Sequence, residues 1–306
     1  MKKAIVSGAN GFVGTALCKE LENQGVAIIA IVRNSNSNIE SLNEIKGIRI
    51  VYADLSDYKH LDDQIKDKDI DVFYHLAWNG TAGTLRSNSD VQLDNVKHTC
   101  DAVRACSRMQ CQKFIFASSI MEYEIESLMQ TERTPTVSTI YSTAKITADY
   151  MARTISGALG IKYVRALISN IYGPGETSPR LINTTIRKLL KGEHCAFSPG
   201  DQIYDFIYIT DAAKAFVAIG EKGVANRTYY IGSQNPRPLK EFLCELRDQV
   251  NSAIEIGLGE IPFEGVSLTY NEFHLDAVER DTGFKPSVTF KEGILNTVDW
   301  IKEGNQ

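Results

Sequence analysis

The sequence contains 306 residues, of which 43% are hydrophobic and 23% are charged, and its formal net charge is −5. This composition is typical of a globular protein with one large α/β domain, or with one domain and a smaller appendage. The acidic balance argues against a nucleic-acid partner, because proteins that bind phosphate backbones usually present a basic face. No apolar run suits a signal peptide or a membrane span, so we expect a cytoplasmic protein without a membrane partner. The six cysteines and five histidines show no metal-ligand spacing, and no metal site is predicted.

In chain order, short β-rich runs alternate with amphipathic helical stretches from residue 2 to about residue 168. We predict helices at Phe12–Asn23, Asp90–Met109 and Tyr141–Leu159, and strands at Lys3–Ser7, Ala27–Val32, Ile48–Tyr52, Val72–His75, Lys113–Ala117 and Tyr163–Ile168. This alternation predicts an α/β fold with a Rossmann-type, doubly wound parallel sheet. It fades after Gly173-Pro174-Gly175, where a smaller C-terminal α/β region begins.

We therefore expect an NAD(P)-binding region over residues 1–175 and a mainly substrate-binding region over residues 176–306. Near residues 204–232 the chain is expected to return to the first region. No linker separates the two, so one body with a cleft between the regions is predicted.

Three glycines, Gly8, Gly11 and Gly14, stand between the first predicted strand and the first predicted helix. Such a turn lets backbone N–H groups and the helix N-terminus approach a pyrophosphate, which a side chain would hold away. We therefore predict a dinucleotide site formed by this turn and by the residues within it, Asn10, Phe12 and Val13.

Arg33 follows the second predicted strand, where proteins that bind NAD usually offer an acid to the ribose hydroxyls. No acid occurs between Glu22 and Glu40, and a guanidinium there suits the 2′-phosphate of NADP. NADP is the predicted cofactor, with NAD as the alternative.

Tyr141 is followed four residues later by Lys145, and this spacing brings both side chains to one helix face. An ammonium about 4 Å from a phenol contributes roughly 4 kcal/mol at an effective dielectric of 20, which would help the phenol to exchange protons near neutral pH. Ser118 and Ser119 close a buried-looking strand, where a hydroxyl can reach the ligand crevice of an open α/β sheet. Ser119, Tyr141 and Lys145 are the candidate catalytic residues.

In this arrangement the chain resembles the extended short-chain dehydrogenase/reductases, the NAD(P)-dependent sugar epimerase/dehydratase family. The resemblance covers most of the chain, and most firmly residues 1–175. The matching segments are GANGFVG at 8–14, YADLSD at 52–57, YHLAW at 74–78, LDNVKHT at 93–99, FASSIMEY at 116–123, YSTAK at 141–145, SNIYGPG at 169–175 and YDFIYITD at 204–211.

The resemblance implies that Ser119 orients the substrate oxygen, that Tyr141 transfers the proton, and that Lys145 lowers the tyrosine's pKa and holds the nicotinamide ribose. It also implies further contacts, with Asp54 and Leu55 beside the adenine, Leu76 and Ala77 beside the ribose and phosphates, and Asn170 at the substrate's phosphates. Asn95 matches a supporting asparagine, and Trp78 begins a polar loop that we expect on the substrate side of the nicotinamide.

Two departures from the family pattern narrow the reaction. Ile120 and Met121 occupy the places where sugar 4,6-dehydratases carry an Asp-Glu pair, so dehydration is rejected. Tyr204 stands where nucleotide-sugar members commonly place an arginine that clamps the diphosphate, which leaves a nucleotide-linked or a free sugar open, with Arg180 or Arg187 as substitutes.

The predicted function is NADPH-dependent reduction of a 4-keto sugar, with Tyr141 as proton donor. The resemblance implies that this sugar is nucleotide-linked. The alternatives are an NAD-retaining C4 epimerase and, more distantly, a non-catalytic NADP redox sensor. Helices 90–109 and 141–159 resemble the pair that family members pack into a four-helix interface, so a homodimer is expected.

Overall fold

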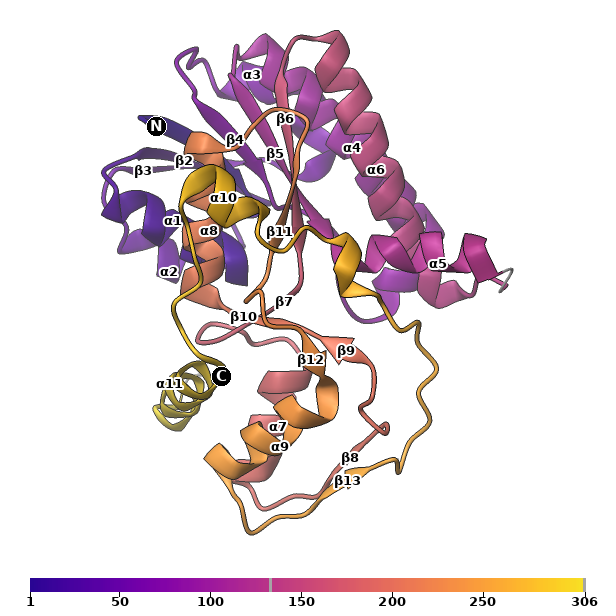
Figure 1. Ribbon diagram of the computed structural model, residues 1–306. Helices are drawn as coiled ribbons and strands as arrows, with labels where there is room; N and C mark the ends of the chain where they lie inside the picture. The colour runs from indigo at the N-terminus through magenta and orange to yellow at the C-terminus, as the bar shows by residue number, and fades with distance from the viewer. Residues whose placement is uncertain (132–133, 305–306) are drawn as a thin grey trace.

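The central element of the fold is a seven-stranded parallel sheet, seen in the computed structural model, which describes residues 1–131 and 134–304 (Figure 1). Its strand order is β11-β6-β5-β4-β1-β2-β3. The strands are β1 (Lys3–Ser7), β2 (Ala27–Val32), β3 (Ile48–Tyr52), β4 (Val72–His75), β5 (Lys113–Ser119), β6 (Lys162–Ile168) and β11 (Thr228–Ile231). This order, which runs outward in both directions from β1 and β4, confirms the predicted doubly wound Rossmann-type fold.

Helices cover both faces of the sheet. Successive side chains of each strand point to opposite faces, so apolar strands contribute to a core on each side of the sheet. In β1, Ala4 and Val6 join one apolar cluster and Ile5 joins the other. The first cluster is covered by α1 (Phe12–Asn23), α2 (Glu40–Asn43) and α8 (Ile209–Lys222). The second is covered by η1 (Leu55–His60), α3 (Leu61–Gln64), α4 (Ser89–Arg108) and α6 (Ile140–Ala158). The observed helices lie within a residue or so of the predicted ones, which is the usual uncertainty of helix ends.

The remaining elements form short connections and a smaller lobe, which Figure 1 shows below the main sheet. The connections are η2 (Thr84–Ser87), η3 (Ile120–Glu122), α5 (Tyr123–Thr131), η4 (Val137–Thr139) and η5 (Tyr270–Glu272). Three two-stranded pairings follow, β7 (Asn170–Tyr172) with β10 (Phe206–Tyr208), β9 (Ile203–Tyr204) with β12 (Arg237–Pro238), and β8 (Cys195–Phe197) with β13 (Ile256–Leu258). The helices of the lobe are α7 (Leu181–Leu190), α9 (Leu239–Val250) and α11 (Phe290–Lys302). Helix α10 (Ala277–Thr282) instead lies over the main body, where it packs against α8 and β11 (Figure 1).

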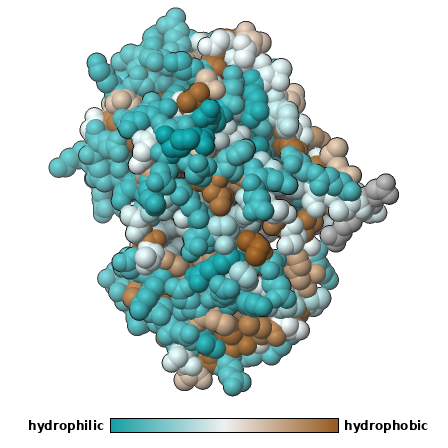
Figure 2. Space-filling view, in the orientation of Figure 1, coloured by the Kyte–Doolittle hydropathy of each residue, from teal (hydrophilic) through white to brown (hydrophobic). Residues whose placement is uncertain are grey.

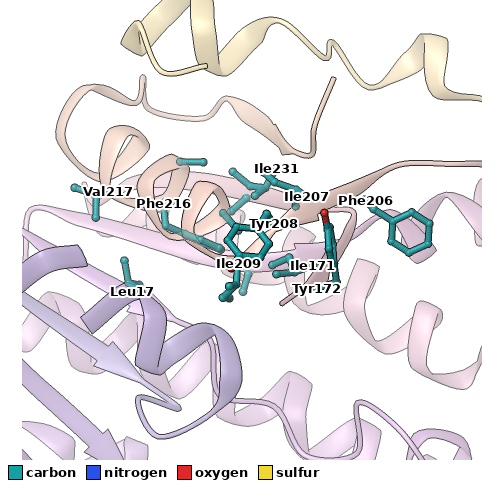
Figure 3. Close-up of a cluster of buried hydrophobic side chains, with 14 of the residues drawn as sticks. Leu17, Ile171, Tyr172, Phe206, Ile207, Tyr208, Ile209, Phe216, Val217 and Ile231 are labelled. Carbon is teal, nitrogen blue, oxygen red and sulfur yellow. The ribbon is translucent and has the colours of Figure 1, made fainter. Parts of the chain in front are cut away.

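The two regions share one apolar core. Leu17 of α1 and Phe216 of α8 belong to the same cluster as Tyr172 of β7 and Phe206 of β10 (Figure 3). Residues 209–231 return to the main body, since α8 packs against α1 and β11 pairs with β6. The division at residue 175 and the assignment of the later part to the substrate remain predictions.

The surface is mainly hydrophilic on the face that Figure 2 draws, with separate apolar patches, one of them over the lower lobe. Within residues 1–131 and 134–304, no helix is long and apolar enough to cross a membrane. The same residues contain no cluster of histidine, cysteine, aspartate or glutamate that could hold a metal ion.

Candidate active site

A cavity of about 750 Å³ lies at the carboxyl ends of the parallel strands, where open α/β sheets bind their ligands. It brings together most of the residues that the sequence singled out: Gly8, Asn10, Gly11, Phe12, Val13, Gly14, Arg33, Leu55, Leu76, Ala77, Trp78, Ser119, Tyr141 and Lys145. Three residues predicted to contact a ligand, Asp54, Asn170 and Arg187, lie outside its described lining. Asp54 caps η1 by accepting a hydrogen bond from the Ser56 backbone N–H at 3.1 Å, and Asn170 lines a second cavity.

The glycine turn between β1 and α1 leaves room for an anion. Gly8 has a φ of +69°, and a Cβ added to it would lie 3.0 Å from the backbone nitrogen of Ala77. A Cβ on Gly14 would lie only 2.1 Å from the Gly8 carbonyl oxygen, so this position excludes any side chain. Helix α1 starts directly after the turn with no side-chain cap, which leaves its first N–H groups for a ligand. The turn therefore fits the pyrophosphate of a dinucleotide.

The part of the lining that follows β2 is polar and includes Arg33. Asn34, Asn36 and Ser37 line the cavity beside it. The Arg33 side chain is 60% exposed, its Nε lies 3.7 Å from Asp54 Oδ2, and its Nη2 donates to Asn79 Oδ1 at 2.5 Å. The guanidinium is therefore held at the cavity edge with most of its surface open to solvent, while Asp54 offsets part of its charge.

Lys145 reaches the reaction end of the cavity from α6. Its Nζ donates to the Ala117 carbonyl oxygen at 2.8 Å and lies 3.7 Å from the centre of the Trp78 ring. Burial lowers the pKa of Lys145 to about 7, and the Glu122 carboxylate opposes this shift. Burial therefore favours the neutral amine, whereas the carbonyl and ring contacts favour the ammonium form.

Tyr141 lies beside it with only 7% of its surface exposed. Burial raises the pKa of Tyr141, whereas the charge of Arg86 and a hydrogen bond with Ser119 lower it. The Arg86 guanidinium carbon stands 3.9 Å from the centre of the Tyr141 ring. A phenolate would be favoured by such a cation, so the local field opposes the cost of burial. That Lys145 lowers this pKa remains a prediction.

Behind Ser119, a buried ionic network anchors the end of β5. Glu122 accepts hydrogen bonds from Ser118 Oγ at 2.5 Å and from the Ser119 backbone N–H at 3.0 Å. Arg165 of β6 donates to Glu122 at 2.5 Å and to Ser118 at 2.9 Å, and its Nε lies 3.6 Å from Asp149. The network fixes the turn from which Ser119 faces the cavity.

The loop from Trp78 to Ser87 is held by two amides on α4. Gln92 accepts from the Trp78 indole at 2.9 Å and donates to the carbonyl oxygens of Asn79, Gly80 and Leu85. Asn95 exchanges two hydrogen bonds with the backbone of Asn79, at 2.9 and 2.8 Å. Asn95 therefore supports the site through the loop, which agrees with the supporting position that it matches.

A second cavity of about 420 Å³ adjoins the first, and Ile171, Glu176 and Arg180 line both. Its walls are mainly apolar and aromatic and include Tyr204, Phe206, Phe197 and Phe263. Asn170 lines it and donates from Nδ2 to the Asp205 carbonyl oxygen at 3.0 Å. Arg180 is paired with the buried Glu176 at 3.2 Å, so the shared wall carries an ion pair.

The sequence by itself did not identify Arg86, Gln92, Glu122 or Glu176 as site residues. Arg86 lies within the polar loop that begins at Trp78, and Glu176 directly follows the Gly-Pro-Gly turn. Glu122 lies within the matching segment FASSIMEY and Gln92 directly precedes LDNVKHT, but the resemblance assigns neither of them a role. A buried polar side chain is recognised only when its partners from other elements are known.

Fold and site together define an enzyme of the extended short-chain dehydrogenase/reductase class, which uses NAD(P). The model of the NAD dependent epimerase/dehydratase family matches residues 4–232, and the chain belongs to this family.

Among curated relatives, the chain is 26% identical to a putative UDP-glucose 4-epimerase of Methanocaldococcus jannaschii, over 99% of each chain. It is 25% identical to a dTDP-glucose 4,6-dehydratase of Shigella flexneri, over 97% of this chain and 92% of the relative. Among solved structures, a UDP-N-acetylglucosamine 4-epimerase from Methanobrevibacter ruminantium, in complex with UDP-N-acetylmuramic acid, superimposes with a TM-score of 0.82 at 23% identity, over 99% of each chain. This last similarity concerns the fold alone.

Proposed function

We propose that this chain is a nucleotide-sugar 4-epimerase that acts through Ser119, Tyr141 and Lys145. The observation that carries the proposal is that these three residues and the glycine turn after β1 line one cavity. The similarity over 99% of both chains to a putative UDP-glucose 4-epimerase supports this reaction. The sequence by itself favoured a reductase, so the relatives change the order of the two candidates.

In this reaction the protein moves one proton and positions one oxygen. Tyr141 takes the proton from the hydroxyl at carbon 4 of the sugar, and Ser119 holds that oxygen by a hydrogen bond. NAD(P), when bound, would accept the hydride from carbon 4 and return it to the opposite face of the ketone. Tyr141 then gives the proton back to the oxygen, so substrate and product differ only in configuration. Lys145 would hold the nicotinamide ribose, and Asn10, Phe12 and Val13 the pyrophosphate.

The wall of the second cavity supports a nucleotide-linked substrate. Tyr204, Phe206, Phe197 and Phe263 offer apolar and aromatic surface that suits a base and ribose. Arg180 lines both cavities and Asn170 lines the second, and these two side chains would contact the diphosphate in place of the missing arginine at position 204. Dehydration is not supported, because Ile120 and Met121 carry no acid or base.

Arg33 favours the second candidate, NADPH-dependent reduction of a 4-keto nucleotide sugar. Its guanidinium stands at the cavity edge among Asn34, Asn36 and Ser37, where polar groups suit a 2′-phosphate. A net reductase exchanges its cofactor, whereas an epimerase returns hydride to its own intermediate and retains it. The cofactor behaviour therefore separates the two.

The test of the reaction uses purified protein incubated with NAD and UDP-glucose, UDP-N-acetylglucosamine or UDP-glucuronate, and product analysis by NMR. An epimerase interconverts the C4 epimers with no net NADH. We expect Tyr141→Phe to lower kcat by a factor of about 100 to 10,000 with unchanged dinucleotide affinity, since the ring stays and only the proton carrier is lost. Stoichiometric NADPH oxidation with 4-keto nucleotide sugars, without epimerisation, would instead establish the reductase.

The cofactor is tested by fluorescence titration of stripped protein with NADPH and NADH. If Arg33 reads a 2′-phosphate, Arg33→Gln weakens NADPH binding about 10-fold or more and leaves NADH affinity unchanged. Arg280→Gln is the matched control, since this arginine is paired on α10 and lies outside both described linings. Equal effects of Arg33→Gln on both dinucleotides would remove the case for NADP.

A further inference from the structure

We propose that Arg86 selects a nucleotide sugar that carries a carboxylate on the ring carbon next to the reacting carbinol. The proposal rests on the proposed function and specifies its substrate class. It concerns a residue in the loop between β4 and α4 that lies outside the described lining of the main cavity but contacts two residues of that lining.

Arg86 is placed by two contacts at the edge of the reaction end. Its guanidinium stacks on the ring of Tyr141 at 3.9 Å, and its Nη1 donates to the Thr81 carbonyl oxygen at 3.1 Å. Both Tyr141 and Thr81 line the main cavity. A sugar whose hydroxyl meets the Tyr141 phenol would therefore bring its neighbouring substituent close to this guanidinium.

Among the residues that the structure describes, the arginines near the cavity differ in whether they have an acidic partner. Arg180 is paired with Glu176, and Arg33 lies beside Asp54. Within residues 1–131 and 134–304, no carboxylate forms a salt bridge with Arg86. Lys145 reaches the same end beside the Trp78 ring, and its ammonium form adds positive charge there, which would help to attract an anion.

The loop that carries Arg86 is built to hold a defined shape. Gly80 has a φ of +71°, and a Cβ there would lie 2.7 Å from the backbone of Leu85, so the loop closes tightly on itself. Gln92 is only 1% exposed and donates to the Leu85 carbonyl oxygen at 3.0 Å, directly before Arg86. A guanidinium held in this way can offer a paired, charge-assisted hydrogen bond to a carboxylate with little loss of side-chain freedom.

The test measures binding by calorimetry to protein saturated with NAD, using UDP-glucuronate and UDP-glucose as probes. Tyr141→Phe serves as the background, because it prevents turnover and keeps the ring that Arg86 contacts. We expect UDP-glucuronate to bind about 10-fold or more tightly than UDP-glucose. Arg86→Gln should abolish this preference and change UDP-glucose affinity by less than about threefold, while Arg86→Lys should retain part of it. Arg280→Gln is again the control for the loss of one positive charge.

Each other outcome has a distinct meaning. If the two probes bind equally before mutation, or if Arg86→Gln weakens both alike, Arg86 does not select a carboxylate, and the proposed 4-epimerase function stands. If neither probe binds and the protein with Tyr141 intact turns over no nucleotide sugar, the proposed function fails, and this inference fails with it.

Discussion

His75, the last residue of β4, is buried against β1 and α4, and its surroundings keep its imidazole neutral. Its Nδ1 lies 3.0 Å from Ser7 Oγ, and its Nε2 lies 3.2 Å from Thr99 Oγ1. Because the Thr99 hydroxyl donates to the Asn95 carbonyl oxygen, Thr99 accepts from His75, which assigns the proton to Nε2. Burial lowers the pKa of His75 to about 3. The ring links β1, β4 and α4 below the glycine turn as a neutral group.

This lowered pKa predicts a pH-dependent stability. The unfolded chain protonates His75 below its ordinary pKa of about 6.5, whereas the folded chain resists protonation until about pH 3. The stability contribution of His75 is therefore present above about pH 6.5 and is lost as the pH falls through this window, by up to about 1.4 kcal/mol per pH unit.

Urea unfolding of wild type and His75→Asn between pH 7 and pH 4 checks this prediction, and the wild type should show the steeper loss. NMR titration of His75 in the folded wild type gives an independent readout, with no protonation expected above about pH 4. Equal slopes in the two proteins, or protonation of His75 near pH 6, would show that the prediction is wrong.

At the scale of elements, the turn from β5 into η3 depends on a buried charge. Glu122 is fully buried and bound by Arg165, Ser118 and the Ser119 backbone. Removing one partner of a buried ion pair leaves the other charge poorly compensated. Without Glu122, the Arg165 guanidinium would keep only Asp149, whose Oδ2 lies 3.6 Å from Arg165 Nε, as an acidic partner.

We expect Glu122→Ala to reduce the free energy of unfolding by about 3 to 5 kcal/mol at neutral pH, as measured by urea denaturation followed by circular dichroism. Glu44→Ala, at an exposed position after α2, is the control and should change the stability by less than about 0.5 kcal/mol. A similar loss in both variants would mean that the network does not stabilise this turn.

At the scale of the whole molecule, the outer surface of α4 and α6 carries exposed apolar side chains. Leu93 of α4 is 65% exposed, and Tyr150 and Met151 of α6 are 59% and 46% exposed. The two helices pack side by side against the same face of the sheet (Figure 1). We propose that a second copy of the chain covers this surface in a homodimer, as the family resemblance implies.

Light scattering of the wild type should therefore give the mass of a dimer, and the double change Leu93→Glu and Tyr150→Glu should give a monomer, because two carboxylates would be buried at the interface. Val224→Glu replaces an exposed valine between α8 and β11 and should leave the dimer intact. A wild-type mass of a single chain would overturn the homodimer.

Much of the fold was predictable because its signals are local in the sequence. Strand β1, the glycine turn and helix α1 follow one another directly, and their apolar periods and glycines report their own conformation. The candidate catalytic residues could be proposed for a related reason. Tyr141 and Lys145 share one helix, and Ser119 ends a strand of a parallel sheet, whose carboxyl edge is where ligands bind. The short pairings β7 with β10, β8 with β13 and β9 with β12 were not predicted, because each joins segments far apart in the chain and carries little periodicity.

The sequence by itself determined the strand–helix alternation of the doubly wound fold, the glycine turn and the placement of Tyr141 and Lys145 on one helix face, because the signals for each of these are local in the chain. Only the tertiary structure decided that Arg86 stacks on Tyr141, that Asp54 lies beside Arg33, and that Glu122 is neutralised by Arg165. Each of these contacts joins separate elements, and a charge acquires its partner and its degree of burial only when packing brings those elements together.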